Sequence, residues 1–114
     1  MELNIICPEC FNVFNFSSKE CKNCSYSIEL NQQKFLIKES INSYNKTVDC
    51  VNRKDFRQAY MISNKEIQIF PFFVEFLELS YYLSLVFGDY SSADNYLTIF
   101  KKSNNTKKYN TLFK

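Results

Sequence analysis

Two short segments within the first thirty residues alternate between apolar and polar positions, at the period of two that is typical of a β-strand. Phe11 and Val13 flank a polar residue, and the alternation returns over residues 26–30. Between these segments, the polar run 17–20 indicates a turn. The pattern therefore predicts a β-hairpin at the N-terminus.

After residue 31 the apolar spacing changes to that of amphipathic helices. The first helical stripe has spacings of four, three, four and three and consists of Ile37, Ile41, Tyr44, Val48 and Val51. Asn31 is a candidate N-cap of this helix, and Asp55 is a candidate N-cap of a second helix. The buried side of the second helix is expected to contain Phe56, Ala59, Tyr60 and either Ile62 or Ser63.

Two further helices are expected on either side of Gly88, the single glycine of the chain. Pro71 suits the first turn of a helix that extends to Phe87, because proline lacks the N–H that later helical positions donate. Asp89 is expected to cap the next helix. The inward stripe of that helix consists of Tyr90, Ala93, Leu97 and Phe100.

The predicted fold class is a small β ribbon followed by an all-α part made of two antiparallel helix pairs. We place the ribbon in residues 1–31 and the four helices in residues 32–103. Residues 104–114 are polar and rich in lysine and have no apolar stripe, so we expect them to form a basic flexible tail.

The compartment is indicated by the N-terminus and by the longest apolar stretch. The N-terminus lacks the features of a secretion signal, so we expect a cytoplasmic protein. Residues 67–87 have the length of a membrane span but include Pro71, Glu75 and Glu78. Because each carboxylate at the bilayer centre costs about 2.5 to 3.5 kcal/mol, we expect no membrane span.

Four cysteines form two C-x-x-C pairs that are separated by ten residues. Two residues between ligands allow a tight turn to direct both sulfur atoms at one metal ion, and a second pair completes a tetrahedron. The predicted ligands are Cys7, Cys10, Cys21 and Cys24. The spacing resembles that of short zinc ribbons over about residues 5–30, which implies one structural Zn²⁺. Phe11 and Ser25 stand where many zinc ribbons have glycine, so we expect backbone strain there.

Other uses of the cysteines remain open. Disulfides or free thiols are one alternative, although five cysteines leave one unpaired in any disulfide scheme. An iron site like that of rubredoxin is a second alternative, and thiol redox chemistry of the C-x-x-C pairs is a third. Cys50 is expected to be a small buried hydrophobe, with a reactive thiol as the alternative.

Two features that often carry catalysis are missing from the sequence. The chain contains no histidine and no glycine-rich phosphate loop. Four thiolate ligands would also leave no coordination position for a catalytic water. We therefore expect that the protein is not an enzyme.

The two helical halves repeat a short motif at an offset of 34 residues. Residues 55–59 and 89–93 share Asp, an aromatic residue, two polar residues and Ala. The motif and its period resemble tetratricopeptide repeats over about residues 37–103, which implies stacked helical hairpins. The chain departs from that family at Lys54, where the turn glycine is usual, and at Tyr81, where a small residue is usual.

The third predicted helix is apolar on nearly all sides, so it is either the central helix or part of a partner surface. The candidate partner-binding residues are Phe72, Phe73, Phe76, Tyr81, Tyr82 and Tyr90. We therefore expect a non-enzymatic zinc-binding adaptor or scaffold. It would dock a partner protein, or a second copy of itself, through its repeat-like helices.

Nucleic-acid binding is the alternative function. Residues 71–100 contain four acidic and no basic side chains, whereas residues 101–114 contain five lysines and no acidic residue. The basic tail and several helical residues would then contact phosphates. The helical residues are Lys34, Lys38, Lys46, Arg53, Lys54 and Arg57. The ribbon argues against this function, because four thiolates and one Zn²⁺ add negative charge to an already acidic segment.

Overall fold

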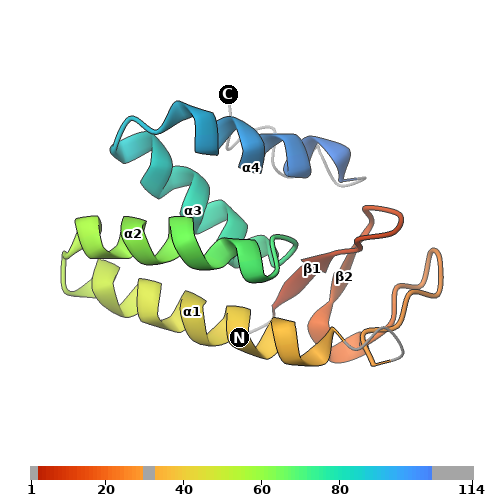
Figure 1. The fold of residues 1–114 in the computed structure, drawn as a ribbon. Helices are drawn as coiled ribbons and strands as arrows, with labels where there is room; N and C mark the ends of the chain where they lie inside the picture. The colour runs from red at the N-terminus through yellow and green to blue at the C-terminus, as the bar shows by residue number, and fades with distance from the viewer. Residues whose placement is uncertain (1–2, 30–32, 104–114) are drawn as a thin grey trace.

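The computed structural model describes residues 3–29 and 33–103. Within them, the predicted combination of a small β part and four α-helices is confirmed (Figure 1). The elements are β1 (Asn4–Ile6), β2 (Val13–Asn15), the 3-10 turn η1 (Phe16–Ser18), α1 (Lys34–Asn52), α2 (Phe56–Glu66), the 3-10 turn η2 (Ile67–Ile69), α3 (Val74–Val86) and α4 (Tyr90–Lys102). The predictions for the Asn31 cap and the 104–114 tail lie outside the described residues.

The N-terminal sheet contains a different strand pair from the predicted hairpin. β1 pairs antiparallel with β2. The predicted strand over residues 26–30 is wrong in its described part, where Ser27 takes part only in an isolated bridge. Its alternation arises because Tyr26 and Ile28 are buried in the core while their neighbours in sequence are less buried. Periodicity in burial therefore occurs here without a strand.

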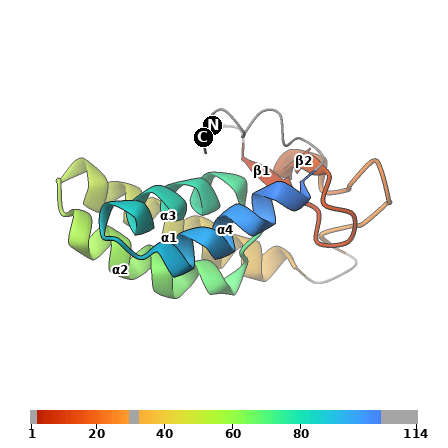
Figure 2. The same ribbon diagram turned by 90° about the horizontal axis from the view of Figure 1, so that it is seen from above.

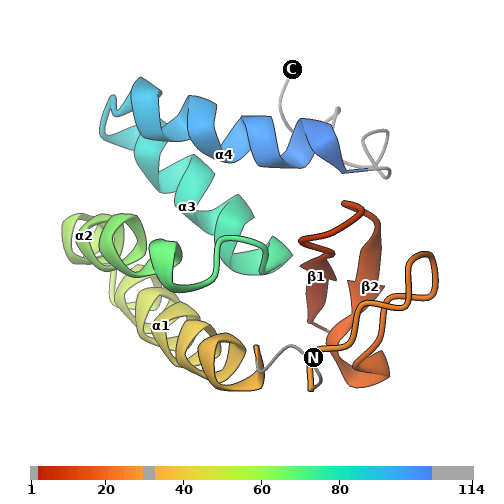
Figure 3. The ribbon, with the colours of Figure 1, turned by 45° about the vertical axis from the view of Figure 1, so that its right-hand side comes forward.

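β1 joins the ribbon to the helices (Figures 1 and 3). One edge of β1 pairs with β2, and its other edge pairs with the chain that precedes α3. Ile5 forms an isolated bridge with Phe73, and the Ile6 N–H donates to the Phe72 carbonyl at 2.8 Å. The ribbon is thus connected by backbone hydrogen bonds to a segment nearly seventy residues further along the chain.

This pairing explains where α3 begins. The helix starts at Val74, whereas the sequence predicted a start at Pro71. The residues between them are bonded to β1 and so do not take part in the helix. The Asn4 N–H donates to both oxygens of the Glu75 carboxylate, each at 3.1 Å, and the Asn4 side-chain amide donates to one of them at 3.0 Å. Glu75 in the first turn of α3 therefore holds β1 in place.

The main hydrophobic core spans the ribbon and the helices. Fully buried members include Ile5, Ile6, Cys7, Cys21, Ile28, Ile37, Ile67, Phe73, Phe76, Leu77 and Phe100. These residues come from β1, from both cysteine pairs and from three of the four α-helices. The ribbon therefore packs on the helices, which the sequence alone did not settle.

α3 is the central helix, which was one of the two interpretations of its apolar sequence. It packs against α1, α2, α4 and β1 (Figures 1 and 2). Two tyrosine hydroxyl groups also connect α2 with α4. Tyr60 donates to Asp89 at 2.6 Å, and Tyr96 donates to Asn64 at 3.0 Å. None of the helices in the described ranges is long and apolar enough to cross a membrane.

The buried face of α1 differs from the predicted stripe. It consists of Ile37, Ser40, Ser43, Thr47 and Cys50, most of which are small. Only Ile37 belongs to the predicted set, and the other four predicted residues are half-buried beside this face. Small side chains permit a close approach of α2, with which α1 makes its main contact. The bulky apolar residues are left to border α3.

The turn between α1 and α2 and the turn between α3 and α4 have the same geometry, at the predicted offset of 34 residues. Lys54 and Gly88 both have a left-handed backbone, with φ of 63° and 72°. The aspartate after each of these residues caps a helix. The Asp55 carboxylate accepts from the Gln58 N–H of α2 at 3.3 Å, and the Asp89 carboxylate accepts from the Ser92 N–H of α4 at 3.2 Å. The sequence repeat is therefore also a repeat of backbone structure.

This repeat yields a matched pair of substitutions. A Cβ atom added at Gly88 would have no heavy atom within 4 Å, so Gly88→Ala tests the left-handed backbone alone. We expect Gly88→Ala to lower the free energy of unfolding by about 1 kcal/mol and Lys54→Gly to raise it by about 0.5 kcal/mol. Urea denaturation monitored by circular dichroism measures both. Equal effects of the same sign would contradict the equivalence of the turns.

Candidate metal centre

Each C-x-x-C pair forms a tight turn, and the two turns are alike. In the first turn, the Cys7 carbonyl accepts from the Phe11 N–H at 2.9 Å, and the Cys7 N–H donates to the Asn12 carbonyl at 2.8 Å. In the second turn, Cys21 makes the corresponding two bonds, both at 2.8 Å, to the residues at the same spacing. The same local backbone thus presents both cysteine pairs.

The residue after each pair adopts a left-handed backbone conformation. Phe11 and Ser25 both have φ of 64°. This conformation costs a residue with a side chain about 1 to 2 kcal/mol, which is why glycine is usual there. The strain that the sequence predicted is therefore present. The Phe11 side chain gains contacts in this position. Its ring centroid lies 6.3 Å from that of Phe72 and 5.6 Å from the Nζ atom of Lys102.

The two turns bring four sulfur atoms together. All four Sγ atoms lie within 4.8 Å of one another, and the four residues are Cys7, Cys10, Cys21 and Cys24. Sγ–Sγ distances of 3.5 Å join Cys7 to Cys24 and Cys10 to Cys21, so each short contact is between the two turns. A tetrahedral ion with metal–sulfur bonds of ~2.3 Å places its ligands roughly 3.8 Å apart. The donor set therefore fits one tetrahedral metal ion.

Burial and hydrogen bonding give the thiols of Cys7 and Cys10 different pKa values. Burial raises the pKa of Cys7 to about 12, in spite of nearby backbone N–H groups that lower it. Burial also raises the pKa of Cys10, but the Asn12 N–H, the Asn23 side chain and neighbouring thiols outweigh it and lower the pKa to about 6. At neutral pH without metal, Cys10 is therefore a thiolate and Cys7 is a thiol whose proton a metal must displace.

The centre is suited to holding structure. A tetrahedral ion bound by four thiolates has no position left for water or substrate. Cys7 and Cys21 are buried in the common core, whereas Cys24 is exposed. An ion bound here would connect the two cysteine turns of the ribbon, and its two buried ligands, Cys7 and Cys21, would belong to the core shared with the helices.

Cys50 lies outside this cluster. Its side chain is buried against Ala59 and Leu83 in a small second core, and the Arg53 guanidinium donates to its Sγ at 3.3 Å. This placement agrees with the prediction of a small buried hydrophobe.

The predicted partner-binding set is divided by the structure. Phe73, Phe76 and Tyr81 are buried in the core, so they are corrected to packing residues. Their aromatic character alone could not distinguish a core from a surface. Phe72 is half-buried against the rings of Phe11 and Phe70. The remaining two residues of the set, Tyr82 and Tyr90, are exposed.

The sequence did not identify Glu75 as a positioning residue. Its carboxylate binds Asn4 and fixes the ribbon against α3. The available signal was an acidic residue directly after an apolar run, next to the predicted start of a helix. That signal indicates a favourable position for a carboxylate in the first turn of a helix, but it does not identify Asn4 as its partner.

The thiol pKa values predict how metal affinity depends on pH. Affinity should rise with pH, because metal and protons compete for sulfur. Below about pH 6 the decline should steepen, because Cys10 then also holds a proton. Co²⁺ titrations monitored by thiolate absorption measure this. Cys50→Ser should behave like the unaltered chain, whereas Cys10→Ser should bind more weakly and lose the steepening. An affinity that is constant over roughly pH 5 to 8 would contradict the assignment.

No family model, curated protein or solved structure matches this chain.

Proposed function

We propose that the protein is a non-enzymatic, zinc-binding adaptor or scaffold of the cytoplasm that docks a partner protein through its helices. The observation that carries this proposal is the exposure of several large apolar side chains on the helices. Four of them occur around the interhelical turns and are Phe56, Val86, Phe87 and Tyr90, with 44, 70, 43 and 66% of their surface exposed. A small domain buries such side chains when packing allows, so their grouping favours a docking surface.

These side chains gather at one end of the molecule. The α1–α2 turn and the α3–α4 turn lie at the end of the helices opposite to the ribbon (Figures 1 and 2). Phe56 begins α2 and Tyr90 begins α4, so both lie next to these turns. The Phe87 ring stacks on Tyr60 at 5.0 Å between centroids, which fixes its position. A preorganised aromatic group of this kind costs little conformational entropy when it binds a partner.

The helices support a repeat-like interpretation. The same turn, the same aspartate cap and the same buried alanine recur after 34 residues, at Ala59 and Ala93. This arrangement resembles two tetratricopeptide-type hairpins, in which helices stack and leave one face for a partner. The outer side of α4 carries the exposed polar residues Ser91, Asp94 and Thr98, which suits the end of such a stack.

The proposed metal is one structural Zn²⁺ per chain. Four soft thiolates in a tetrahedral arrangement suit zinc, and binding would supply folding energy to a segment too short for a core of its own. In this proposal the ion supports the ribbon and the partner binds the helices. The function is therefore one of assembly and not of chemistry.

Nucleic-acid binding is the second candidate. All six basic residues of the predicted set are exposed on α1, on α2 or in the turn between them. Three of them are spread along α1, a helix of 19 residues, where they are interspersed with acidic residues such as Glu39 and Asp49. Acidic neighbours reduce the number of phosphates that such a surface neutralises, and therefore its affinity for nucleic acid. We place this function second for that reason.

Removal of the exposed apolar side chains tests the docking surface. We expect the combined change Val86→Ser and Tyr90→Ser to abolish capture of a partner protein from native lysate without lowering the free energy of unfolding, because both side chains are mostly exposed. Phe35→Ser is the control, since Phe35 is 68% exposed but lies at the start of α1, near the ribbon.

Two outcomes would contradict the proposal. One is a chain that captures no protein and stays monomeric. The other is binding to RNA or DNA that falls steeply with salt, which would favour the second candidate.

A further inference from the structure

The exposed apolar side chains beside the α1–α2 and α3–α4 turns form one surface. Phe56 and Tyr60 lie one helical turn apart on α2, so they share a face of that helix. The Tyr60 ring stacks on Phe87, and its hydroxyl donates to Asp89. Tyr60 therefore connects the aromatic residue beside the first turn with the second turn, where Tyr90 follows. We call this surface the turn-end patch, and its members are Phe56, Val86, Phe87 and Tyr90.

The turn-end patch has the size of the apolar part of a protein interface. Its four members are 43 to 70% exposed. They present roughly 400 Å² in total, if a whole large side chain presents about 150 to 250 Å². A standard interface buries about 800 Å² on each partner, and a little over half of that area is apolar. The patch therefore supplies the apolar area that one side of a stable complex needs.

Opposite charges border the patch on its two sides. The α1–α2 turn and the start of α2 contain three exposed basic residues, Arg53, Lys54 and Arg57, with Asp55 as their acidic neighbour. The side of the α3–α4 turn contains Asp89 and Asp94, and residues 71–100 include no basic residue. One side of the patch is therefore basic and the other side is acidic.

These charges are accessible to another molecule. The hydrogen bond from Tyr60 holds the pKa of the Asp89 carboxyl below its usual range, so this group is charged at neutral pH. Asp94 is exposed in α4, one helical turn after the first residue of that helix. In the part of the chain that the structure describes, Lys54, Arg57 and Asp94 take part in no salt bridge.

We propose that the turn-end patch binds a second copy of the same chain, in a dimer with two-fold symmetry. This inference rests on the proposed docking function and names its partner. The two patches meet at the centre of the contact, and the basic α1–α2 turn of each copy faces the acidic α3–α4 turn of the other. A two-fold contact uses the same surface on both copies, so the assembly closes at two chains.

The arrangement of charge favours this occupant over others. A partner with charges of a single sign would be attracted by one side of the patch and repelled by the other. An uncharged apolar partner would desolvate charges on both sides without offering a counter-charge, which costs free energy. An identical surface turned by half a rotation presents acid to base on both sides and apolar surface at the centre. A second copy therefore satisfies the whole patch at once.

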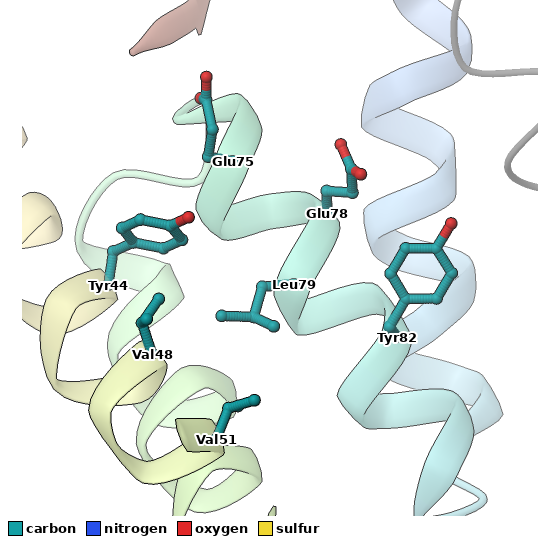
Figure 4. A pocket seen from close by; sticks show the side chains of 7 residues that line it. All are labelled: Tyr44, Val48, Val51, Glu75, Glu78, Leu79 and Tyr82. Atoms are coloured by element: carbon teal, nitrogen blue, oxygen red, sulfur yellow. The ribbon is translucent and has the colours of Figure 1, made fainter. Parts of the chain in front are cut away.

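Sedimentation of the full chain tests the dimer. Over roughly 1 µM to 1 mM we expect a reversible equilibrium between one and two chains. The combined change Val86→Ser and Tyr90→Ser should raise the Kd of the dimer at least about tenfold, because it removes apolar contact from both copies. Val48→Ser is the control. Val48 lines the groove between α1 and α3, which is not part of the patch, so this change should leave the Kd unaltered (Figure 4).

Charge reversal tests the orientation of the two copies. Lys54→Glu with Arg57→Glu makes both sides of the patch acidic, and Ser91→Lys with Asp94→Lys makes both sides basic. All four positions are exposed, so both variants should fold. Each variant alone should raise the Kd about tenfold or more, because like charges then meet. An equimolar mixture of the two variants should form dimers again, because each acidic patch then meets a basic one.

Lys38→Glu with Lys65→Glu is the matched control for charge. Both lysines are exposed, and they lie near the ends of α1 and α2 that face away from the turn-end patch. This variant changes the net charge as much as Lys54→Glu with Arg57→Glu does, and it should dimerise like the unaltered chain. An equal loss of dimer in both variants would overturn the proposal, because net charge alone would then decide. Failure of the mixed variants to dimerise would also overturn it.

Three outcomes separate this inference from the adaptor function. If the unaltered chain is monomeric but captures a different protein through Val86 and Tyr90, the dimer inference fails and the adaptor function stands. If the chain is monomeric and captures nothing, both fail. A dimer that Val48→Ser disrupts and that Val86→Ser with Tyr90→Ser does not would also overturn the inference, because the copies would then meet at the groove.

Discussion

The structure depends on β1, a strand of three residues that is hydrogen-bonded on both edges. A two-stranded sheet of this size is not stable alone, and a segment of about thirty residues cannot bury a sufficient core. β1 ends directly before Cys7, the first cysteine of the thiol cluster, and its other edge is bonded to the residues that lead into α3. β1 therefore connects the thiol cluster to the central helix α3.

Local chemistry could be predicted from the sequence. The two C-x-x-C pairs, the strain at Phe11 and Ser25, and the aspartate caps follow from residue types within a few positions of each other. The 34-residue repeat was visible because a short motif recurs, and the equal turn geometry at Lys54 and Gly88 has the same local origin.

Non-local contacts could not be predicted in this way. β1 shows no alternation of its own, because Ile5 and Ile6 are both fully buried, one between the ribbon and α3 and the other beside the metal turn. The partner of β1 lies far along the chain, and nothing in the local sequence identifies it. The buried face of α1 was predicted wrongly for the same reason. The small residues on α1 pack against α2, and the sequence of α1 alone does not identify that neighbour.

Glu75 connects the ribbon with the central helix. Its carboxylate in the first turn of α3 accepts hydrogen bonds from the backbone and the side chain of Asn4 in β1. A metal ion at the thiol cluster would support β1, and these bonds would extend that support to the start of α3. The proposed docking residues lie at the other end of the helices, so the proposed ion would stabilise the fold without contacting the partner.

Hydrogen exchange of the metal-loaded chain, measured before and after a chelator is added, tests this account most directly. Removal of the metal should release protection of the Ile6 N–H and of the first turn of α3, while the amides of α1 and α2 that face each other stay protected. Unchanged protection at Ile6 and at the start of α3 after the metal has been removed would contradict the account, and so would an equal loss of protection in all four helices.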